Sequence, residues 1–311
     1  MKIIFWGTPE FAIPSLNSII ESEHELVAVV TQPDKRRGRG KTITPSPVKR
    51  RALEQGIQVF TPENIKKQTE IKNKILSLKA DLYFVVAFGQ LLPTDVLKGP
   101  PLGSWNCHAS LLPRWRGAAP IQWSLLQGDK TTGVAIMAME EDLDTGPILT
   151  SRIVEIGLLD NYRFLSEKLS LISAELLIDS LLIIELVGQG EQFYRLNKLG
   201  ITCQGDLDNT PTYARMIKKE DYLINWFKSS FEIHKKIMAL YPNAHTYRGK
   251  TRIKILNSIP LSEDCDTYLP KAVSNKLQNI IINNESPGTI IEVIEKIGFV
   301  VATTTIPILI T

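Results

Sequence analysis

The chain has 311 residues and a formal net charge of +3, with 43% hydrophobic and 22% charged residues. This composition is that of a globular protein and excludes collagen-like and disordered classes, while the length favours two domains over one core. The N-terminus enters an apolar run directly, without the charged region and cleavage site of a signal peptide, so we expect a cytoplasmic protein.

The first half of the chain alternates short apolar runs with helical patterns, which is typical of βαβ units around a buried parallel sheet. The apolar runs predict strands at residues 2–6, 25–31, 57–60, 82–87, 103–108, 133–139 and 147–156. The helical patterns predict helices at residues 11–20, 47–55, 65–79, 119–127 and 163–187. The last of these carries six charged residues, too many for a membrane span, so we expect it to pack on a core.

Residues 188–210 lose this periodicity and gain Gly, Gln, Asn and Asp, as linkers do. Beyond them, one helical pattern is followed by short strand-like runs with turn residues between them, which indicates a small barrel. The helix is predicted at residues 230–240 and the runs at residues 244–247, 252–256, 288–294 and 298–303. We therefore predict an α/β fold, with a mainly parallel sheet in residues 1–187, a linker at 188–210 and a smaller β-barrel domain at 211–311.

Basic residues are concentrated in two segments of the chain. Residues 34–51 contain eight Lys or Arg against Asp34 alone, and residues 213–256 contain ten against three acids. Clusters of this kind attract the phosphates of nucleic acid. A single basic run is more often a solvated face, so these segments do not define a function alone.

The densest group of unusual residues, 106–120, starts at the end of a predicted strand. Because side chains alternate along a strand, Asn106 and His108 share one face and Cys107 points to the other. A carboxamide and an imidazole side by side can donate hydrogen bonds to a developing oxyanion. The plainer interpretation is a buried Asn and His that satisfy backbone groups.

An acidic run follows the next predicted strand, at residues 140–144. A carboxylate at Asp144, in the same sheet as His108, could face that imidazole and orient its ring. Four acids in five residues also fit a solvated turn, and composition alone does not select one of them.

Nucleotide-binding and metal motifs are incomplete in this sequence. The segment after the first strand, residues 7–11, lacks G-x-G-x-x-G, and Lys35 stands where a P-loop ending at residues 40–42 needs its first glycine. The three cysteines are far apart and form no C-x-x-C pair, so neither a zinc site nor a redox site is predicted.

The chain resembles the methionyl-tRNA formyltransferase family over nearly its whole length. The run His108-Ala109-Ser110-Leu111-Leu112-Pro113 is similar to a folate-formyltransferase signature, and the Arg-x-Arg-Gly-Ala-Ala-Pro that follows it is highly specific. Further similar motifs stand at residues 5–11, 32–34, 38–41, 45–49, 142–146, 213–214 and 219–226.

The resemblance implies a Rossmann-like catalytic domain and an OB-like tRNA-binding domain. It implies transfer of the formyl group of 10-formyltetrahydrofolate to the amino group of methionyl initiator tRNA, by a monomer without a metal or a membrane partner. The implied catalytic residues are Asn106, His108 and Asp144. The implied folate contacts are Phe88, Gly89, Gln90, Leu91, Leu92, Ser110, Leu111, Leu112 and Pro113. The implied RNA contacts, on a basic loop at residues 34–44, are Lys35, Arg36, Arg37, Arg39 and Lys41.

The sequence departs from the family pattern in the second domain. Leu240-Tyr241-Pro242 replaces a Pro-Trp-Pro-like stretch, and Asn225 stands where Asp is usual. Relatives also continue beyond the position of Thr311, so we expect either a barrel short of one strand or a truncated chain.

Two other functions share part of this pattern. Formyl transfer to a small amine, such as glycinamide ribonucleotide or an amino sugar, would use the same three residues, but the basic loop and the second domain disfavour it. A nucleic-acid-binding protein with a degenerate catalytic domain would need only the basic segments. The intact Asn106, His108 and Asp144 disfavour that interpretation.

Overall fold

The computed structural model describes residues 1–37, 42–188, 192–274 and 285–311, and the chain divides into two compact units. The first unit consists of Met1–Pro120, Thr132–Val154 and Ser166–Ala214, and the second consists of Ile121–Thr131, Glu155–Leu165 and Arg215–Thr311. Each unit therefore gathers segments that are far apart in the sequence.

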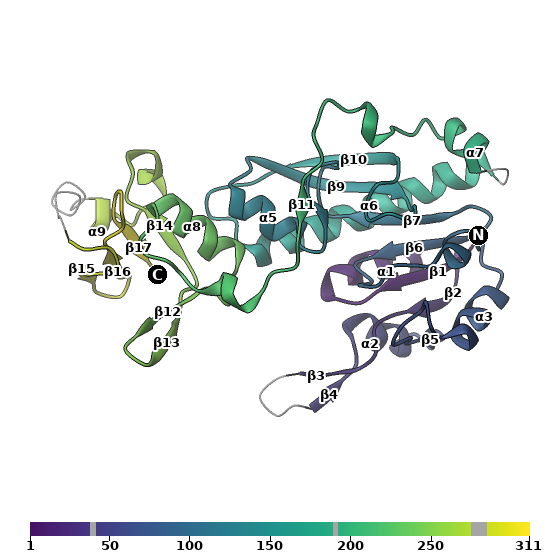
Figure 1. Cartoon of the computed structure of the whole chain (residues 1–311), viewed down its shortest axis with the longest axis horizontal. Helices are drawn as coiled ribbons and strands as arrows, with labels where there is room; N and C mark the ends of the chain where they lie inside the picture. The colour runs from purple at the N-terminus through teal and green to yellow at the C-terminus, as the bar shows by residue number, and fades with distance from the viewer. Residues whose placement is uncertain (38–41, 189–191, 275–284) are drawn as a thin grey trace. The chain divides into compact units, whose positions relative to one another are not determined.

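The first unit is built on a seven-stranded sheet in the order β10-β9-β7-β6-β1-β2-β5 (Figure 1). Its strands are β1 (Lys2–Gly7), β2 (Glu25–Val30), β5 (Val59–Phe60), β6 (Leu82–Val86), β7 (Ser104–His108), β9 (Thr131–Ala138) and β10 (Ile148–Glu155). The pairs among β5, β2, β1, β6 and β7 are all parallel, whereas β7 and β9 are antiparallel. The sequence prediction of a mainly parallel α/β sheet is confirmed. Strands β1 and β6 are buried along nearly their whole length, because the centre of a parallel sheet is covered on both faces.

Most helices of the α/β pattern form close to where the sequence predicts them. The helical segments up to residue 214 are η1 (Glu10–Ala12), α1 (Ile13–Ile20), α2 (Pro47–Glu54), α3 (Thr69–Ser77), α4 (Thr94–Leu97), α5 (Pro120–Gln127), α6 (Tyr162–Val187), α7 (Gln192–Lys198) and η2 (Gln204–Asp206). Helix α2 starts where Ser46 accepts a hydrogen bond from the backbone N of Lys49, with Pro47 in the first turn. A serine cap followed by proline is a strong start signal.

Helix α3 begins four residues later than predicted. The backbone N of Ile65 donates to Oε1 of Gln90 at 2.9 Å, and Nε2 of Gln90 donates to the carbonyl of Pro62 at 2.9 Å. A side chain distant in sequence thus binds the backbone that the first helical turn would use. Helical periodicity cannot report such a competitor.

Helix α6 is the long apolar segment of the sequence. Leu165, Leu169, Leu177, Leu181 and Ile184 are fully buried along one stripe, at the spacing of a helix that packs on a core. Within the described residues, no helix is both long enough and apolar enough to cross a membrane.

Two short strand pairs were absent from the sequence prediction. Strands β3 (Lys35–Arg37) and β4 (Thr42–Thr44) form an antiparallel pair in the basic segment. Strands β8 (Arg116–Gly117) and β11 (Tyr213–Ala214) pair in parallel, although almost a hundred residues separate them. Segments of two or three residues are too short to show a period of two, so only their partners define them.

Besides most of α5, the second unit contains short helices and a small set of antiparallel strands, all beyond Ala214. Its elements are η3 (Lys219–Tyr222), α8 (Ser230–Ala239), β12 (His245–Arg248), β13 (Thr251–Lys254), β14 (Ser258–Pro260), η4 (Glu263–Tyr268), α9 (Lys271–Ser274), β15 (Ile290–Ile294), β16 (Gly298–Val301) and β17 (Ile308–Ile310). Strands β12 and β13 form a hairpin, and the other four strands form a sheet in the order β14-β17-β16-β15. Helix α8 starts with a reciprocal capping box between Ser229 and Glu232. The predicted helix and four strand runs are confirmed, whereas β14 and β17 were missed and closure into an OB-like barrel stays a prediction.

A buried histidine of the second unit makes its stability sensitive to pH. His234 is 3% exposed, its Nε2 donates to the carbonyl of Leu158 at 2.8 Å, and its Nδ1 lies 3.1 Å from the hydroxyl of Ser258. Burial lowers the pKa of His234, so the fold favours the neutral ring. This contribution to stability is complete above about pH 6.5, the ordinary histidine pKa, and is lost progressively as the pH falls below it.

We expect the unfolding temperature of the wild-type chain to fall more steeply than that of His234→Gln as the pH is lowered below about 6.5. The glutamine retains an amide donor for the carbonyl of Leu158 but has no proton to gain in this range. Differential scanning calorimetry over a pH series measures the difference. Parallel curves for the two proteins would contradict this explanation.

Candidate active site

The C-terminal ends of β6 and β7 lie side by side, because the two strands are parallel neighbours. Residues 87–92 follow β6 and residues 109–113 follow β7, so two of the predicted contact segments leave the sheet at the same edge. In open α/β sheets this edge is where ligands bind.

The two faces of β7 have different surroundings. Cys107 forms a side-chain hydrogen bond with Ser173 of α6, and burial raises the pKa of its thiol to about 12. Cys107 therefore belongs to the helix-covered face. Asn106 and His108 alternate with it and occupy the opposite face, as predicted, where they pair with Met137 and Ala135 of β9.

The imidazole of His108 is held through one nitrogen. Nε2 lies 2.9 Å from the carbonyl oxygen of Trp115, and because a carbonyl only accepts, Nε2 carries the hydrogen. Nδ1 lies 3.7 Å from Oδ2 of Asp144, which is beyond hydrogen-bond distance but within the reach of an ion pair. The plain interpretation of a histidine bonded to backbone therefore accounts for Nε2 and leaves Nδ1 directed toward the carboxylate.

Asp144 is the one acid of its run that faces His108. The side chain of Asp144 is 10% exposed, while Glu141 and Asp142 are exposed to solvent. The backbone N of Gly117 donates to Oδ2 of Asp144 at 2.7 Å and holds the carboxylate in place. Composition did not show which acid of residues 140–144 faces His108. The burial of Asp144 and its bond with Gly117 identify it.

The route by which Asp144 reaches His108 differs from the one the sequence suggests. Strand β9 is antiparallel to β7, so its last residue, Ala138, lies beside Trp105 rather than beside His108. The loop from 139 to 147 must return along the sheet to bring Asp144 to the imidazole. Asp144 itself adopts a φ of 55°, in the left-handed region that Asp tolerates better than most residues.

The carboxamide of Asn106 has no hydrogen-bond partner among the residues that the structure describes. Asn106 is 9% exposed, and its amide atoms are not among the fully buried polar atoms without a partner in the described residues, so the amide reaches the surface of the site. An amide whose donors and acceptor are not used within the fold can bind a ligand. This observation favours a binding role over the plain interpretation of a satisfied core asparagine.

The predicted folate contacts fall into two groups. Phe88 and Leu92 are buried in the core beside the sheet, and Leu112 packs with Ala135 and Met137, so these side chains are structural. Gly89, with a φ of 87°, and the exposed Leu91 stand in the turn that follows β6.

The rest of this set shapes the backbone of the two turns. Gln90 holds residues 62–65, as described above, and the hydroxyl of Ser110 donates to the carbonyl of Arg114 at 2.6 Å. Leu111 packs closely against Gly133 of β9, and Pro113 ends the signature run. These segments can present mainly backbone groups to a ligand.

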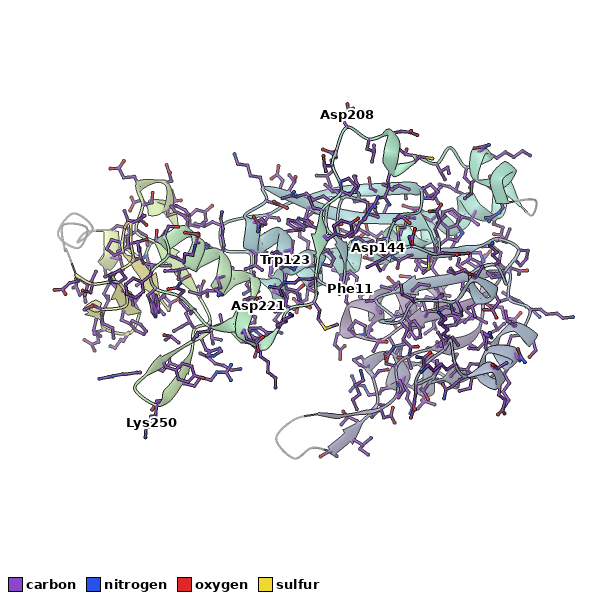
Figure 2. All side chains as sticks on the ribbon, in the orientation of Figure 1. Phe11, Trp123, Asp144, Asp208, Asp221 and Lys250 are labelled. Atoms are coloured by element: carbon purple, nitrogen blue, oxygen red, sulfur yellow. The ribbon has the colours of Figure 1, made fainter. Side chains whose placement is uncertain are left out.

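Three of the five predicted RNA contacts belong to β3. Lys35 is exposed, Arg36 and Arg37 belong to the strand, and Arg39 and Lys41 lie outside the described residues. In the second unit, the β12–β13 hairpin also exposes basic side chains, with Lys250 at its turn (Figure 2). The exposed basic residues of this hairpin are Arg248, Lys250, Arg252 and Lys254.

Two polar residues that sequence reasoning missed lie against the site. Arg116 is 9% exposed and Gln204 is 5% exposed, and both nitrogens Nε and Nη2 of Arg116 donate to Oε1 of Gln204. Arg116 belonged to a recognised motif, but Gln204 lies in a segment expected to be a linker and carried no signal.

The described residues contain no group of three or more His, Cys, Asp or Glu side chains that could hold a metal ion. The arrangement places Asn106 and His108 on one face of β7, with the carboxylate of Asp144 3.7 Å from the imidazole. Such a site suits acyl-type transfer between two bound substrates, where charge develops on a carbonyl oxygen.

Comparison with known proteins defines the class. A family model described as formyl transferase matches residues 1–181, and a model described as formyl transferase, C-terminal domain, matches residues 216–311. A methionyl-tRNA formyltransferase of Prochlorococcus marinus is 51% identical over 314 residues, covering 100% of this chain and 91% of the relative. One of a Synechococcus species is 48% identical, with the same coverage. The chain belongs to the methionyl-tRNA formyltransferase family.

Solved structures share the fold at lower identity. An N-formyltransferase from Helicobacter canadensis, in complex with folinic acid and dTDP-3-aminofucose, has a TM-score of 0.66 and 20% identity, covering 100% of this chain and 99% of its own. WlaRD, a sugar 3N-formyl transferase, has a TM-score of 0.65 and 20% identity, covering 100% and 97%. These likenesses support the fold of the whole chain.

Proposed function

We propose that this chain transfers the formyl group of 10-formyltetrahydrofolate to the amino group of methionyl initiator tRNA, producing N-formylmethionyl-tRNA for translation initiation. The observation that carries the proposal is the approach of Asp144 to within 3.7 Å of Nδ1 of His108, on the face of β7 that also carries Asn106. The full-length similarity to methionyl-tRNA formyltransferases supports the same substrates.

The three side chains have distinct roles in this proposal. Asn106 and the doubly protonated ring of His108, through Nδ1, donate hydrogen bonds to the formyl oxygen as negative charge develops on it. Asp144 orients and charge-balances His108 and takes up the proton of the attacking amine, directly or through water. The amine attacks the formyl carbon of 10-formyltetrahydrofolate, the bond between that carbon and N10 breaks, and the proton removed from the amine is returned to N10 of the departing tetrahydrofolate.

The residues present fit this co-substrate. The amide of Asn106 lacks a partner among the described residues, and the turns at residues 87–92 and 109–113 leave the same edge of the sheet. Gly89, with its φ of 87°, gives the first turn a backbone that can approach a flat ring closely. We assign the folate contacts to these two turns.

One assay tests the function and separates it from its rivals. The purified protein is incubated with 10-formyltetrahydrofolate and either charged initiator tRNA, uncharged tRNA, glycinamide ribonucleotide or an amino sugar. We expect formylated product with charged initiator tRNA alone. Product with a small amine would favour the rival transferase, and tRNA binding without any product would favour a binding protein with a degenerate catalytic domain.

The basic segment at residues 34–44 is proposed to bind the acceptor arm of the tRNA. Alanine at Arg39 should weaken tRNA-dependent activity and reduce the slope of log affinity against log salt by about 1, because each phosphate contact releases about one counterion. Lys35→Ala should act in the same direction, and Lys79→Ala serves as a control outside the basic segments. Binding titrations at several salt concentrations measure the slopes. An unchanged slope for Arg39→Ala would rule out a phosphate contact there.

The remaining assignments complete the proposal. We propose a catalytic domain at residues 1–187, a linker at residues 188–210 and a tRNA-binding domain at residues 211–311. The exposed basic hairpin formed by β12 and β13 supports the role of the last of these. We further propose that the protein is a monomer. We also propose that it acts in the cytoplasm, where charged tRNA and folate are both available.

A further inference from the structure

The side chain of Gln204 binds the loop that carries Asp144. Its Nε2 donates to the carbonyl of Asp144 at 2.9 Å and to the carbonyl of Gly146 at 2.8 Å. Its Oε1 accepts from Nε of Arg116 at 3.0 Å and from Nη2 at 2.7 Å. Both hydrogens and both lone pairs of one amide are therefore used, in a side chain that is 5% exposed.

The orientation of this amide follows from its neighbours. A guanidinium has donors only, so Oε1 must face Arg116. Backbone carbonyls have acceptors only, so Nε2 must face Asp144 and Gly146. A flipped amide would lose all four hydrogen bonds, which leaves one arrangement of Gln204 compatible with its surroundings.

These bonds close a ring around the carboxylate. Gln204 binds the backbone of Asp144 and the side chain of Arg116, and the next residue, Gly117, donates its N–H to Oδ2 of Asp144 at 2.7 Å. The carbonyl that Gln204 binds belongs to the residue with the left-handed φ of 55°. The amide thus stabilises the local backbone conformation that aims the carboxylate at His108.

The same chain segment also supports the other side of the site. The hydroxyl of Thr212 accepts from the backbone N of Trp115 at 2.9 Å, and the carbonyl of Trp115 binds Nε2 of His108. Residues 204–212 therefore contact the backbone that holds both members of the His108–Asp144 pair. A segment without regular periodicity is here part of the support of the site.

We propose that Gln204 is a positioning residue that sets the distance and direction of Asp144 relative to His108. This inference rests on the proposed function, in which those two groups act in formyl transfer. Without the amide, the loop at residues 139–147 keeps its sequence and its contact with Gly117, but loses the bonds that define its backbone at Asp144 and Gly146. A displacement of about 1 Å at a reacting group costs on the order of 100-fold in rate.

Two substitutions test the role. Gln204→Glu keeps the shape and the contact with Arg116 but turns acceptors toward the two carbonyls, and Gln204→Met removes all four hydrogen bonds. We expect each to lower kcat about 10- to 100-fold, with KM for either substrate changed less than about threefold. The matched control is Asp208→Asn, at an exposed position of the same segment (Figure 2), which should leave both constants unchanged.

A double-mutant cycle shows whether Gln204 acts through Asp144. In an Asp144→Asn background, Gln204→Met should have little further effect on kcat, because the group it positions has already lost its function. The pH–rate profile of Gln204→Met should also shift relative to wild type, which a general loss of stability would not produce. Circular dichroism and thermal unfolding verify that each variant is folded.

The outcomes separate this inference from the proposed function. Absence of formylated tRNA with the wild-type protein would reject the proposed function itself. If the wild-type protein is active and both Gln204 variants have a normal kcat, the positioning role alone is overturned. Additive effects in the double-mutant cycle would overturn it as well. Loss of folding in both variants would also overturn it, because Gln204 would then determine stability rather than the position of Asp144.

Discussion

Replacing His108 with alanine is expected to lower the turnover of formyl transfer by about 10²–10³-fold, because a donor to the developing oxyanion is lost. The hydrogen bond between Nε2 and the carbonyl of Trp115 fixes the orientation of the imidazole. Nδ1 is therefore the ring nitrogen that can bind the substrate. Single-turnover measurements with charged initiator tRNA isolate the chemical step from substrate binding. KM should change little, since the ring acts on the transition state more than on the bound substrates.

The control for this substitution lies one residue away. Cys107→Ala changes the same strand on the face that meets Ser173 of α6, away from Asn106 and His108. It should retain nearly full turnover even if it lowers the unfolding temperature. Near-normal turnover of His108→Ala, with the folded state preserved, would remove the imidazole from the chemistry.

Replacing Asp144 with asparagine is expected to lower turnover by about 10²–10⁴-fold, the range of general acid–base catalysis. An asparagine oxygen can still accept the hydrogen bond from the backbone N of Gly117, so the loop keeps its anchor. What is lost is the negative charge 3.7 Å from Nδ1 of His108 and the acceptor for the proton of the amine. The effect therefore reports on chemistry rather than on loop folding.

A neighbouring acid makes the Asp144 test more specific. Asp142→Asn, a change at an exposed acid in the same run, should leave the rate intact. If Asp142→Asn and Asp144→Asn gave equal losses, the acidic run would act through its total charge and the assignment of Asp144 would be wrong.

The residues of β7 show what a period of two can predict. Alternation placed Asn106 and His108 on one face and Cys107 on the other, and the structure confirms that division. It could not reveal that Asn106 lacks a partner among the described residues, since an unmet hydrogen bond depends on every neighbour of the side chain. The sequence also could not show that, among the predicted folate contacts after β6, Phe88 and Leu92 are core residues whereas Leu91 is exposed.

The position of Asp144 beside His108 could not be predicted correctly from neighbouring residues in the sequence. A position directly after a strand suggested nearness to His108, but β9 is antiparallel and its end lies by Trp105. The return of the loop depends on bonds from Gly117 and from Gln204, which are 27 and 60 residues away from Asp144. No pattern within a window of the sequence carries such contacts.

The sequence by itself determined the α/β class, the two basic segments, the shared face of Asn106 and His108, and the family to which their motifs belong. These features follow from periodicity and from short runs of residues, which act over a few neighbours along the chain. The tertiary structure alone decided which acid meets His108, how Gln204 and Arg116 enclose it, and where β8 pairs with β11. Such contacts join residues far apart in sequence, and their geometry exists only once the sheet has brought those residues together.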